Sequence, residues 1–323
     1  MDGEGRNTPH RVLVAEFMDT EGLRALRDDF DVVYVPGLGE DRGGLLRACP
    51  GAAALVVRNR CRVDAEVLRA AGPGLRVVGR LGAGLDNVDL EACRAAAVRV
   101  VFARGANADA VCEYVFAALL LRCRRLAAAE REVRSGGWPR EAFIGTELGG
   151  KTIGLLGLGE VGRRVAERAR AFGLEVLGYD PGLPPDRLAA VPARIEPFED
   201  ILAAADFVSL HLPLLPETRH LIDARALARM RPGAVLVNAA RGGIVDEAAL
   251  LAALRAGRPG GAVLDVREAE PPPSPDPLAE LPEVLLTPHL AGLTAEAQAR
   301  VGCMIAAGVR AVLAGAEPAA AAV

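Results

Sequence analysis

The chain has 323 residues, of which 51% are hydrophobic and 25% charged, and its formal net charge is −4. This length allows one large or two medium domains, and the small negative charge gives no basic surface of the kind that binds nucleic acid. The longest apolar stretch, residues 111–121, is too short to cross a bilayer, and the N-terminal residues contain no apolar signal core, so we expect a cytoplasmic protein.

Short apolar runs alternate with amphipathic stretches along the chain, which predicts βαβ units and parallel sheets. The first series of predicted strands covers residues 11–17, 31–35, 53–58, 76–81 and 98–103. After one long predicted helix over 107–134, a second series covers 152–156, 175–179, 206–210, 234–238, 261–266 and 284–287. Six strands with intervening helices are what a complete doubly wound dinucleotide-binding fold requires. A last predicted helix over 294–313 is expected to cross back to the first domain, and the Ala-rich residues after Gly315 are expected to fray.

A glycine-rich turn follows the first strand of the second series. Gly157, Gly159 and Gly162 form G-x-G-x-x-G between that strand and an amphipathic helix predicted over 161–172. In this context Gly157 permits a tight turn, Gly159 lets a pyrophosphate approach the backbone, and Gly162 allows close helix–strand packing. Asp180 ends the next strand, where an acid accepts hydrogen bonds from a ribose 2′-hydroxyl and repels a 2′-phosphate. The motif therefore predicts NAD in preference to NADP, with a glycine-rich turn of some other α/β protein as the alternative.

Residues 145–152 also match the phosphate-binding pattern G-x-x-x-x-G-K-[ST]. That loop must follow a strand and open a helix, whereas this stretch precedes a predicted strand. We expect a turn that leads into the nucleotide-binding domain.

The six cysteines form no CxxC pair, and the histidines are too scattered for a zinc site, so we expect reduced thiols and no metal.

Three polar segments stand at the carboxyl ends of predicted strands, where open α/β sheets bind ligands. They are residues 238–247 (NAARGGIVDE), 264–271 (LDVREAEP) and 286–289 (LTPH). With residues 82–89 (GAGLDNVD) and the glycine-rich turn, they occur in the order typical of the D-isomer-specific 2-hydroxyacid dehydrogenases, which the chain resembles over essentially its whole length. The resemblance implies two Rossmann-like doubly wound parallel-sheet domains with a cleft between them. It places the substrate domain at residues 1–103 plus 291–323 and the NAD-binding domain at 104–290.

The resemblance implies that Arg241, Glu270 and His289 are catalytic. Oxidation of a secondary alcohol requires loss of a proton from O2 as the hydride leaves C2, and a histidine accepts such a proton near neutral pH. A glutamate beside His289 would hold its ring and stabilise the imidazolium. The donor fork of Arg241 suits a substrate carboxylate and polarises the C2 oxygen. Without this context, a histidine in a Thr-Pro-His turn is more often structural.

Further residues are expected to line the cofactor. The resemblance implies Gly157, Gly159, Glu160, Val161, Gly162, Asp180, Pro213, Ala239, Ala240, Arg241, Asp265, His289 and Gly292. Asp265 is expected to face the nicotinamide amide, with a strand-end cap as the alternative. A structural or cofactor-lining role is expected for His211, and His10 and His220 are expected on the surface.

The substrate residues implied by the resemblance are Arg58, Asn59, Ala83, Gly84, Asn107 and Arg241. Residues 58–60 (Arg-Asn-Arg) resemble the phosphate-contacting segment of the D-3-phosphoglycerate dehydrogenase branch, although Cys61 replaces the usual Thr or Ser. Residues 16–19 (EFMD), 58–60 and 136–140 (GGWPR) resemble bacterial (S)-sulfolactate dehydrogenases. Both similarities predict a 2-hydroxy acid with an anionic group on C3; the alternative is that Arg58 and Arg60 are only solvated charges.

The expected function is therefore an NAD-dependent oxidoreductase that acts on the CH–OH group of a small D-2-hydroxy acid. Glyoxylate or hydroxypyruvate reduction is an enzymatic alternative, and an NAD(H)-sensing protein like the C-terminal-binding corepressors is a non-enzymatic one. A homodimer is expected by analogy with the family, through the long helix after Asn107 and the segment around Trp138. The chain stops soon after the last helix, so a C-terminal regulatory domain is not expected.

Overall fold

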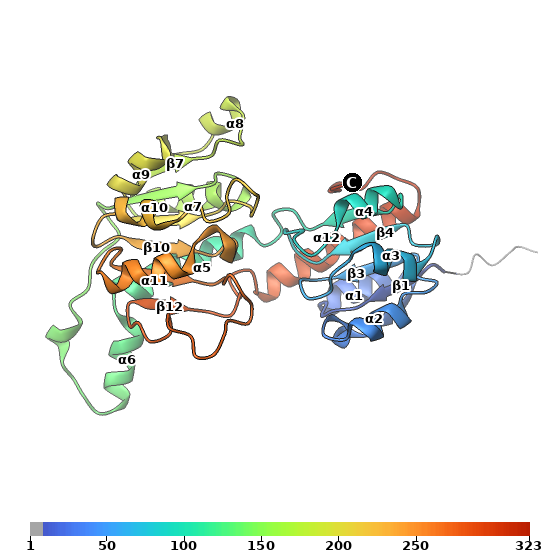
Figure 1. Cartoon of the computed structure of the whole chain (residues 1–323), viewed down its shortest axis with the longest axis horizontal. Helices are drawn as coiled ribbons and strands as arrows, with labels where there is room; N and C mark the ends of the chain where they lie inside the picture. The colour runs from blue at the N-terminus through green and yellow to red at the C-terminus, as the bar shows by residue number, and fades with distance from the viewer. Residues whose placement is uncertain (1–8) are drawn as a thin grey trace, which may run out of the picture. The chain divides into compact units, whose positions relative to one another are not determined.

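The computed structural model describes residues 9–323. Most of the N-terminal segment, in which we expect no signal core, therefore lies outside the described residues. The chain divides into two compact units, one comprising residues up to Asn107 together with Leu293–Val323, and the other Ala108–Gly292. Each unit contains one parallel sheet with helices on both faces (Figure 1). This confirms the predicted class of two Rossmann-like α/β domains. Within residues 9–323, none of the helices combines the length and the apolar character needed to cross a membrane.

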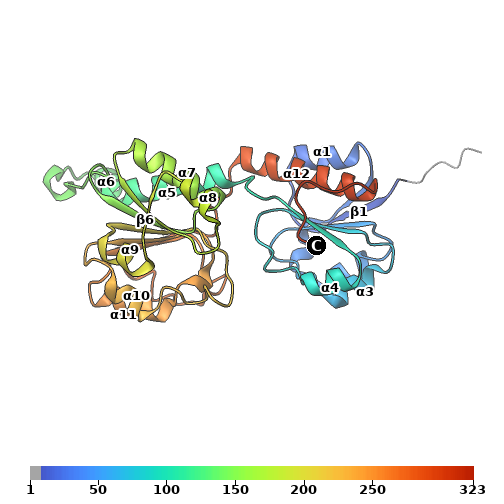
Figure 2. The ribbon, with the colours of Figure 1, turned by 90° about the horizontal axis from the view of Figure 1, so that it is seen from above.

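The first unit contains a five-stranded sheet in the order β2-β1-β3-β4-β5. Its strands are β1 (Arg11–Val14), β2 (Asp31–Tyr34), β3 (Ala54–Val57), β4 (Val77–Arg80) and β5 (Arg99–Phe102). One face carries α1 (Thr20–Arg27) and α12 (Ala295–Leu313), and the other carries α2 (Arg42–Ala48), α3 (Ala65–Ala71) and α4 (Leu90–Ala95), as Figure 2 shows for α1, α12, α3 and α4. A short 3₁₀ helix, η1 (Pro36–Gly39), follows β2.

Alternate residues of each strand enter opposite cores because successive side chains of a strand point to opposite faces. Val12 and Val14 of β1 pack beneath α1 and α12, whereas Leu13 packs with the apolar side chains of α2 and α3. Because both faces are covered, the strands read as continuous apolar runs. Helix α12 belongs to the first unit and packs on its sheet, although in the chain it follows the last strand of the second sheet.

The Ala-rich C-terminus differs from the prediction of a frayed tail. The main-chain N–H of Ala322 donates to Val100 O (2.9 Å), and Ala321 forms an antiparallel bridge with Val101 of β5. The side chains of Ala322 and Val323 pack against the apolar core. An edge strand offers unpaired main-chain groups to any nearby extended segment, so β5 orders a tail that has no intrinsic signal for structure.

The second unit contains a seven-stranded sheet in the order β12-β11-β10-β9-β6-β7-β8. Its strands are β6 (Thr152–Leu156), β7 (Glu175–Tyr179), β8 (Arg194–Ile195), β9 (Phe207–Leu210), β10 (Val235–Asn238), β11 (Gly261–Leu264) and β12 (Val284–Leu286). The helices are α5 (Ala108–Cys123), α6 (Leu126–Arg134), η2 (Arg140–Phe143), α7 (Glu160–Ala171), α8 (Pro185–Ala189), α9 (Phe198–Ala204), α10 (Ala224–Arg229), η3 (Gly242–Ile244) and α11 (Glu247–Arg255). The prediction of six strands was wrong by one, because β8 is a two-residue exposed edge strand that leaves no apolar pattern.

The single helix predicted over residues 107–134 is in fact two. Arg125 adopts a φ of 53°, and α6 starts after it. The main-chain N–H of Thr146 donates to Cys123 O (2.9 Å), and a Cβ on Gly145 would lie 2.3 Å from the same oxygen. The returning chain thus occupies the end of α5, and the helix breaks there. The segment 145–152 leads into β6, which begins at Thr152, so it is not followed by the helix that a phosphate-binding loop requires.

Candidate active site

The strand order of the second sheet reverses at β6, whose neighbours are β7 and β9. The turn after β6 lies at this switch point, where open α/β sheets bind ligands. Gly157 has a φ of 98°, and a Cβ there would lie 2.5 Å from His211 O at the end of β9. A Cβ on Gly162 would lie 2.0 Å from Gly157 O. Only glycine therefore permits this turn and the close seating of α7.

The first turn of α7 fits a dinucleotide pyrophosphate. Its N-cap residue is Gly159, which makes no side-chain capping hydrogen bond, and a Cβ built on it would meet no atom within 4 Å. The first N–H groups of a helix have no partner within the helix, and the positive end of its dipole favours an anion there. Glu160 instead turns along the helix, where its carboxylate pairs with Arg163 (3.2 Å) and Arg164 (2.9 Å).

Asp180 follows β7 and is fixed against the same turn. Its Oδ2 accepts a hydrogen bond from Leu158 N–H (2.8 Å), and its Oδ1 accepts one from Gly182 N–H (3.0 Å). Each oxygen keeps a second lone pair, which suits a ribose hydroxyl. Within residues 9–323, no lysine or arginine forms an ion pair with Asp180 that would favour a 2′-phosphate. The geometry of the turn, α7 and Asp180 therefore fits NAD.

Arg241 follows β10, and its main chain is held by a buried asparagine. Asn238 donates its Nδ2 to Arg241 O (2.9 Å) and accepts Ala240 N–H on its Oδ1 (3.1 Å). A Cβ on Gly242 would lie 1.9 Å from Arg267 O, so the loop after β10 lies directly against the loop after β11. Ala239 and Ala240 are partly buried in this loop, and Pro213 is exposed after β9.

His289 and Glu270 form a hydrogen-bonded pair, with Nδ1 of the ring 2.7 Å from Glu270 Oε2. Both side chains are partly exposed, at 40% and 35% respectively. The other carboxylate oxygen of Glu270 accepts Arg267 N–H (3.0 Å). Burial alone raises the pKa of Glu270, but the hydrogen bonds from His289 and Arg267 and the charges of His289 and Arg241 outweigh it and lower that pKa. Glu270 is therefore an anion near neutral pH, and the ring nitrogen facing it carries the shared proton.

The His289 turn is organised by the buried carboxylate of Asp265. Its Oδ1 accepts Thr287 Oγ1–H (2.6 Å) and Leu290 N–H (2.8 Å), and its Oδ2 accepts Ala291 N–H (2.8 Å). His289 has a φ of 53° and donates its N–H to Asp265 O (2.7 Å). Asp265 thus supports an otherwise unfavourable backbone conformation, in addition to the cofactor contact expected of it.

A hydroxyl relay extends this support to α5. Because Thr287 donates its only hydroxyl proton to Asp265, the 2.6 Å contact between Thr287 Oγ1 and the Tyr114 hydroxyl requires Tyr114 to be the donor. Burial raises the pKa of Tyr114 to about 12, so this donor keeps its proton.

At the end of β9, desolvation lowers the pKa of His211 to about 4, and its Nε2 lies 2.9 Å from Ser209 Oγ. His211 is therefore neutral near physiological pH.

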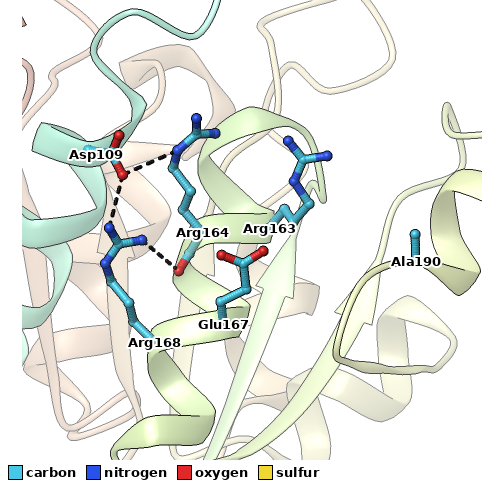
Figure 3. Close-up of a pocket in the computed structure, with 6 residues that line it drawn as sticks. All are labelled: Asp109, Arg163, Arg164, Glu167, Arg168 and Ala190. Atoms are coloured by element: carbon cyan, nitrogen blue, oxygen red, sulfur yellow. Dashed lines mark hydrogen bonds and ion pairs between the residues drawn. The ribbon is translucent and has the colours of Figure 1, made fainter.

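A charged hollow lies beside α7 (Figure 3). It is lined by Asp109, Arg163, Arg164, Glu167, Arg168 and Ala190. The carboxylate of Asp109 on α5 pairs with Arg164 (3.3 Å) and Arg168 (2.9 Å), as the dashed lines show. The ion pairs of Asp109 connect α5 to α7, which identifies a structural network.

The expected substrate residues other than Arg241 all belong to the first unit. Arg58 and Asn59 follow β3, Ala83 and Gly84 follow β4, and Asn107 is the last residue before α5. Of the other histidines, His10 is exposed, and His220 is partly exposed and pairs with Glu268.

Sequence reasoning missed four residues that hold the expected site residues in place. Asn238, Thr287 and Tyr114 support the loops of the second unit, and Glu16 supports the turn after β3. Asn238, Thr287 and Glu16 lie in the motifs 238–247, 286–289 and 16–19, so their position at strand ends was the available signal. Tyr114 gives none, because it lies within an apolar helix.

A glycine-rich turn at the switch point, an acid after the second strand and a histidine–carboxylate pair at the carboxyl ends of the same sheet define the class of nicotinamide-dependent dehydrogenases. Residues 116–291 match the family model for the NAD-binding domain of D-isomer specific 2-hydroxyacid dehydrogenases. The chain belongs to this family, and the expected NAD cofactor is confirmed at the level of the family.

Known relatives agree with this assignment. The chain is 48% identical over 304 residues to D-3-phosphoglycerate dehydrogenase of Mycobacterium leprae, covering 94% of this chain but only 57% of that protein. It is 45% identical to (S)-sulfolactate dehydrogenase of Chromohalobacter salexigens, covering 94% and 98% of the two chains. The crystal structure of the TT0316 protein from Thermus thermophilus superposes with a TM-score of 0.90 at 37% identity, covering 97% of this chain and 100% of that one.

Proposed function

We propose that the protein transfers a hydride between NAD and C2 of a D-2-hydroxy acid that carries a phosphate or sulfonate on C3. The proposal is supported most directly by the His289–Glu270 pair, which lies in the same domain as the cofactor turn. The positive charge of Arg241 contributes to the lowered pKa of Glu270. The named relatives act, by their names, on D-3-phosphoglycerate and on (S)-sulfolactate. Both compounds are small 2-hydroxy acids with a second anionic group.

His289 is the proposed acid–base catalyst. Because Nδ1 faces an ionised Glu270, it carries the proton of the neutral ring, and Nε2 keeps an unshared lone pair. Nε2 can therefore accept the proton from O2 during alcohol oxidation and return it during reduction of the oxo acid. The cofactor supplies the hydride acceptor at its nicotinamide ring. Glu270 stabilises the imidazolium that each oxidation produces.

Arg241 is proposed to bind the carboxylate at C1 and to polarise O2. A guanidinium donates in a planar fork that matches a carboxylate, and its charge also stabilises negative charge that develops on O2. Asn238 holds the main chain here through one hydrogen bond to Arg241 O and one from Ala240 N–H. The guanidinium of Arg241 is therefore carried by a main-chain segment that these hydrogen bonds already fix.

Residues of the first unit are proposed to recognise the rest of the substrate. Arg58 would bind the anionic C3 group, with Asn59, Ala83, Gly84 and Asn107 as further substrate-side positions. Ala83 is exposed and Gly84 partly exposed after β4, so their main-chain groups are open to a ligand. This assignment distinguishes a C3-anionic substrate from lactate or glycerate.

Initial rates with D-3-phosphoglycerate, (S)-3-sulfolactate, D-glycerate and D-lactate test the substrate class. We expect kcat/KM to be highest for one of the two anionic compounds, and equal values for all four would contradict the proposal. His289→Ala tests the mechanism, and we expect turnover to fall by about 100-fold or more. NADH binding, followed by its fluorescence, should persist; near-normal turnover would place the base elsewhere.

We further propose a homodimer formed through residues 126–144 of the second unit. This segment exposes large apolar side chains: Leu126 (51%), Val133 (50%), Trp138 (75%) and Ile144 (78%). A run of exposed apolar side chains in one segment is typical of an interaction surface. The mass of the wild-type protein in solution tests this proposal.

A further inference from the structure

The turn after β3, residues 58–61, is built around a buried carboxylate. Glu16 follows β1 and is only 4% exposed. Its Oε1 accepts the main-chain N–H groups of Arg58 (2.7 Å) and Cys61 (3.0 Å), and its Oε2 accepts that of Arg60 (3.0 Å). One side chain thus binds three of the four peptide N–H groups in the turn.

This turn lies at the switch point of the first sheet, because β1 is flanked by β2 on one side and β3 on the other. Ligands of open α/β sheets bind outside the carboxyl ends of the strands at such a point. The opposite side of the turn is fixed by Asn87, whose Nδ2 donates to the carbonyl oxygens of Arg58 (3.2 Å) and Cys61 (2.6 Å). Three of the four donors and two of the four acceptors of the turn are therefore occupied.

The two arginines of the turn differ in their surroundings. Arg60 forms an ion pair with Glu40, and its side chain is 64% exposed. The guanidinium carbon of Arg58 instead lies 5.9 Å from the centre of the Phe17 ring, and within residues 9–323 no carboxylate forms an ion pair with it. Desolvation lowers the pKa of Arg58, against the opposing effect of the Glu16 charge, although the guanidinium stays charged at neutral pH. A partly desolvated cation of this kind gains most from an incoming anion.

We propose that Glu16 is a positioning residue that, together with Phe17, directs Arg58 toward the anionic C3 group of the substrate. The inference rests on the proposed function and deepens it. Because Glu16 occupies the N–H groups of Arg58, Arg60 and Cys61, these groups are not available to the ligand. Recognition of the C3 anion therefore depends on the side chain of Arg58. Discrimination between anionic and neutral C3 groups depends on the turn that holds this side chain.

The experiment compares Glu16→Gln with wild type, using D-3-phosphoglycerate and D-glycerate as the anionic and neutral C3 substrates, with (S)-3-sulfolactate as a second anion. The amide nearly matches the carboxylate in shape but places an NH₂ group against the peptide donors of the turn. We expect kcat/KM for the anionic substrates to fall by about ten-fold, mainly through KM. The value for D-glycerate should change by less than about two-fold, since that substrate makes no C3 ion pair.

Two further variants separate positioning from folding. Glu21→Gln removes an exposed carboxylate on α1 and should leave the substrate ratio unchanged. Phe17 is 54% exposed, so Phe17→Leu should fold even if Glu16→Gln does not. It should lower the anion preference by about three-fold through loss of the ring beneath Arg58.

The possible outcomes are distinguishable. If wild type itself shows no preference for an anionic C3 group, the proposed substrate class fails. If wild type has the preference but Glu16→Gln and Phe17→Leu retain it, the positioning role is wrong and the proposed function stands. An equal fall for both kinds of substrate in Glu16→Gln would show a structural role alone and would also overturn the inference.

Discussion

Replacing Glu270 with glutamine tests the central pair of the site. The hydrogen bond from His289 Nδ1 to Glu270 Oε2 is 2.7 Å long and joins a charged acceptor to the ring that must become cationic. Such bonds contribute about 1.5–3 kcal/mol, and 1.36 kcal/mol of lost transition-state stabilisation is ten-fold in rate. Because the two side chains are 40% and 35% exposed, solvent screening favours the lower part of this range. We therefore expect kcat for alcohol oxidation to fall by about 10- to 30-fold.

The direction of the accompanying pH effect follows from the charge. Glu270 is ionised because its pKa is lowered, so it favours the protonated form of the neighbouring ring. Without this anion the proton-accepting form of the ring persists to lower pH. The midpoint of the rise in oxidation rate with pH should therefore move to lower pH in Glu270→Gln.

Stopped-flow measurement of NADH formation, together with full pH profiles, provides the assay. Glu268→Gln is the matched control. Glu268 lies two positions before Glu270 in the sequence, and it also pairs with a histidine, His220. Its rate and pH midpoint should remain close to those of wild type. A Glu270→Gln enzyme with near-normal kcat, or an equal loss in Glu268→Gln, would refute the assigned role of the pair.

Three other changes give measurable outcomes. Asp180→Ala should raise kcat/KM for NADPH relative to NADH by about ten-fold, because a carboxylate that repels a 2′-phosphate is removed; an unchanged ratio would count against its role. Gly242→Ala should lower stability by about 1–3 kcal/mol in urea unfolding, since the added Cβ would lie 1.9 Å from Arg267 O, whereas Gly233→Ala, which meets no atom within 4 Å, should show no such clash. Trp138→Glu should convert a dimer to a monomer in analytical ultracentrifugation, and a wild-type monomer would reject the proposed interface.

Much of the fold follows from local patterns in the sequence. Short apolar runs that alternate with amphipathic stretches predict both parallel sheets, and β6 and β7 have the predicted bounds because glycines and an acid mark where they end. The glycine-rich turn is equally local, since the need for a positive φ at Gly157 is a property of the turn. His289 and Glu270 were expected to be adjacent, and they form a hydrogen bond although they are 19 positions apart in the sequence.

Other features depend on contacts between distant segments. The break at Arg125 arises because residues 145 and 146 cover the end of α5, and the tail is ordered because β5 presents an open edge. The motif 16–19 gives no sign that Glu16 accepts hydrogen bonds from the turn after β3, which lies more than 40 residues later. The sequence by itself determined the two domains, the cofactor turn and the residue types available for chemistry, since each depends on neighbouring residues. Tertiary structure alone decided how Asp265, Asn238 and Glu16 support those residues, because a buried polar side chain takes its partners from whichever peptide groups the fold brings to it.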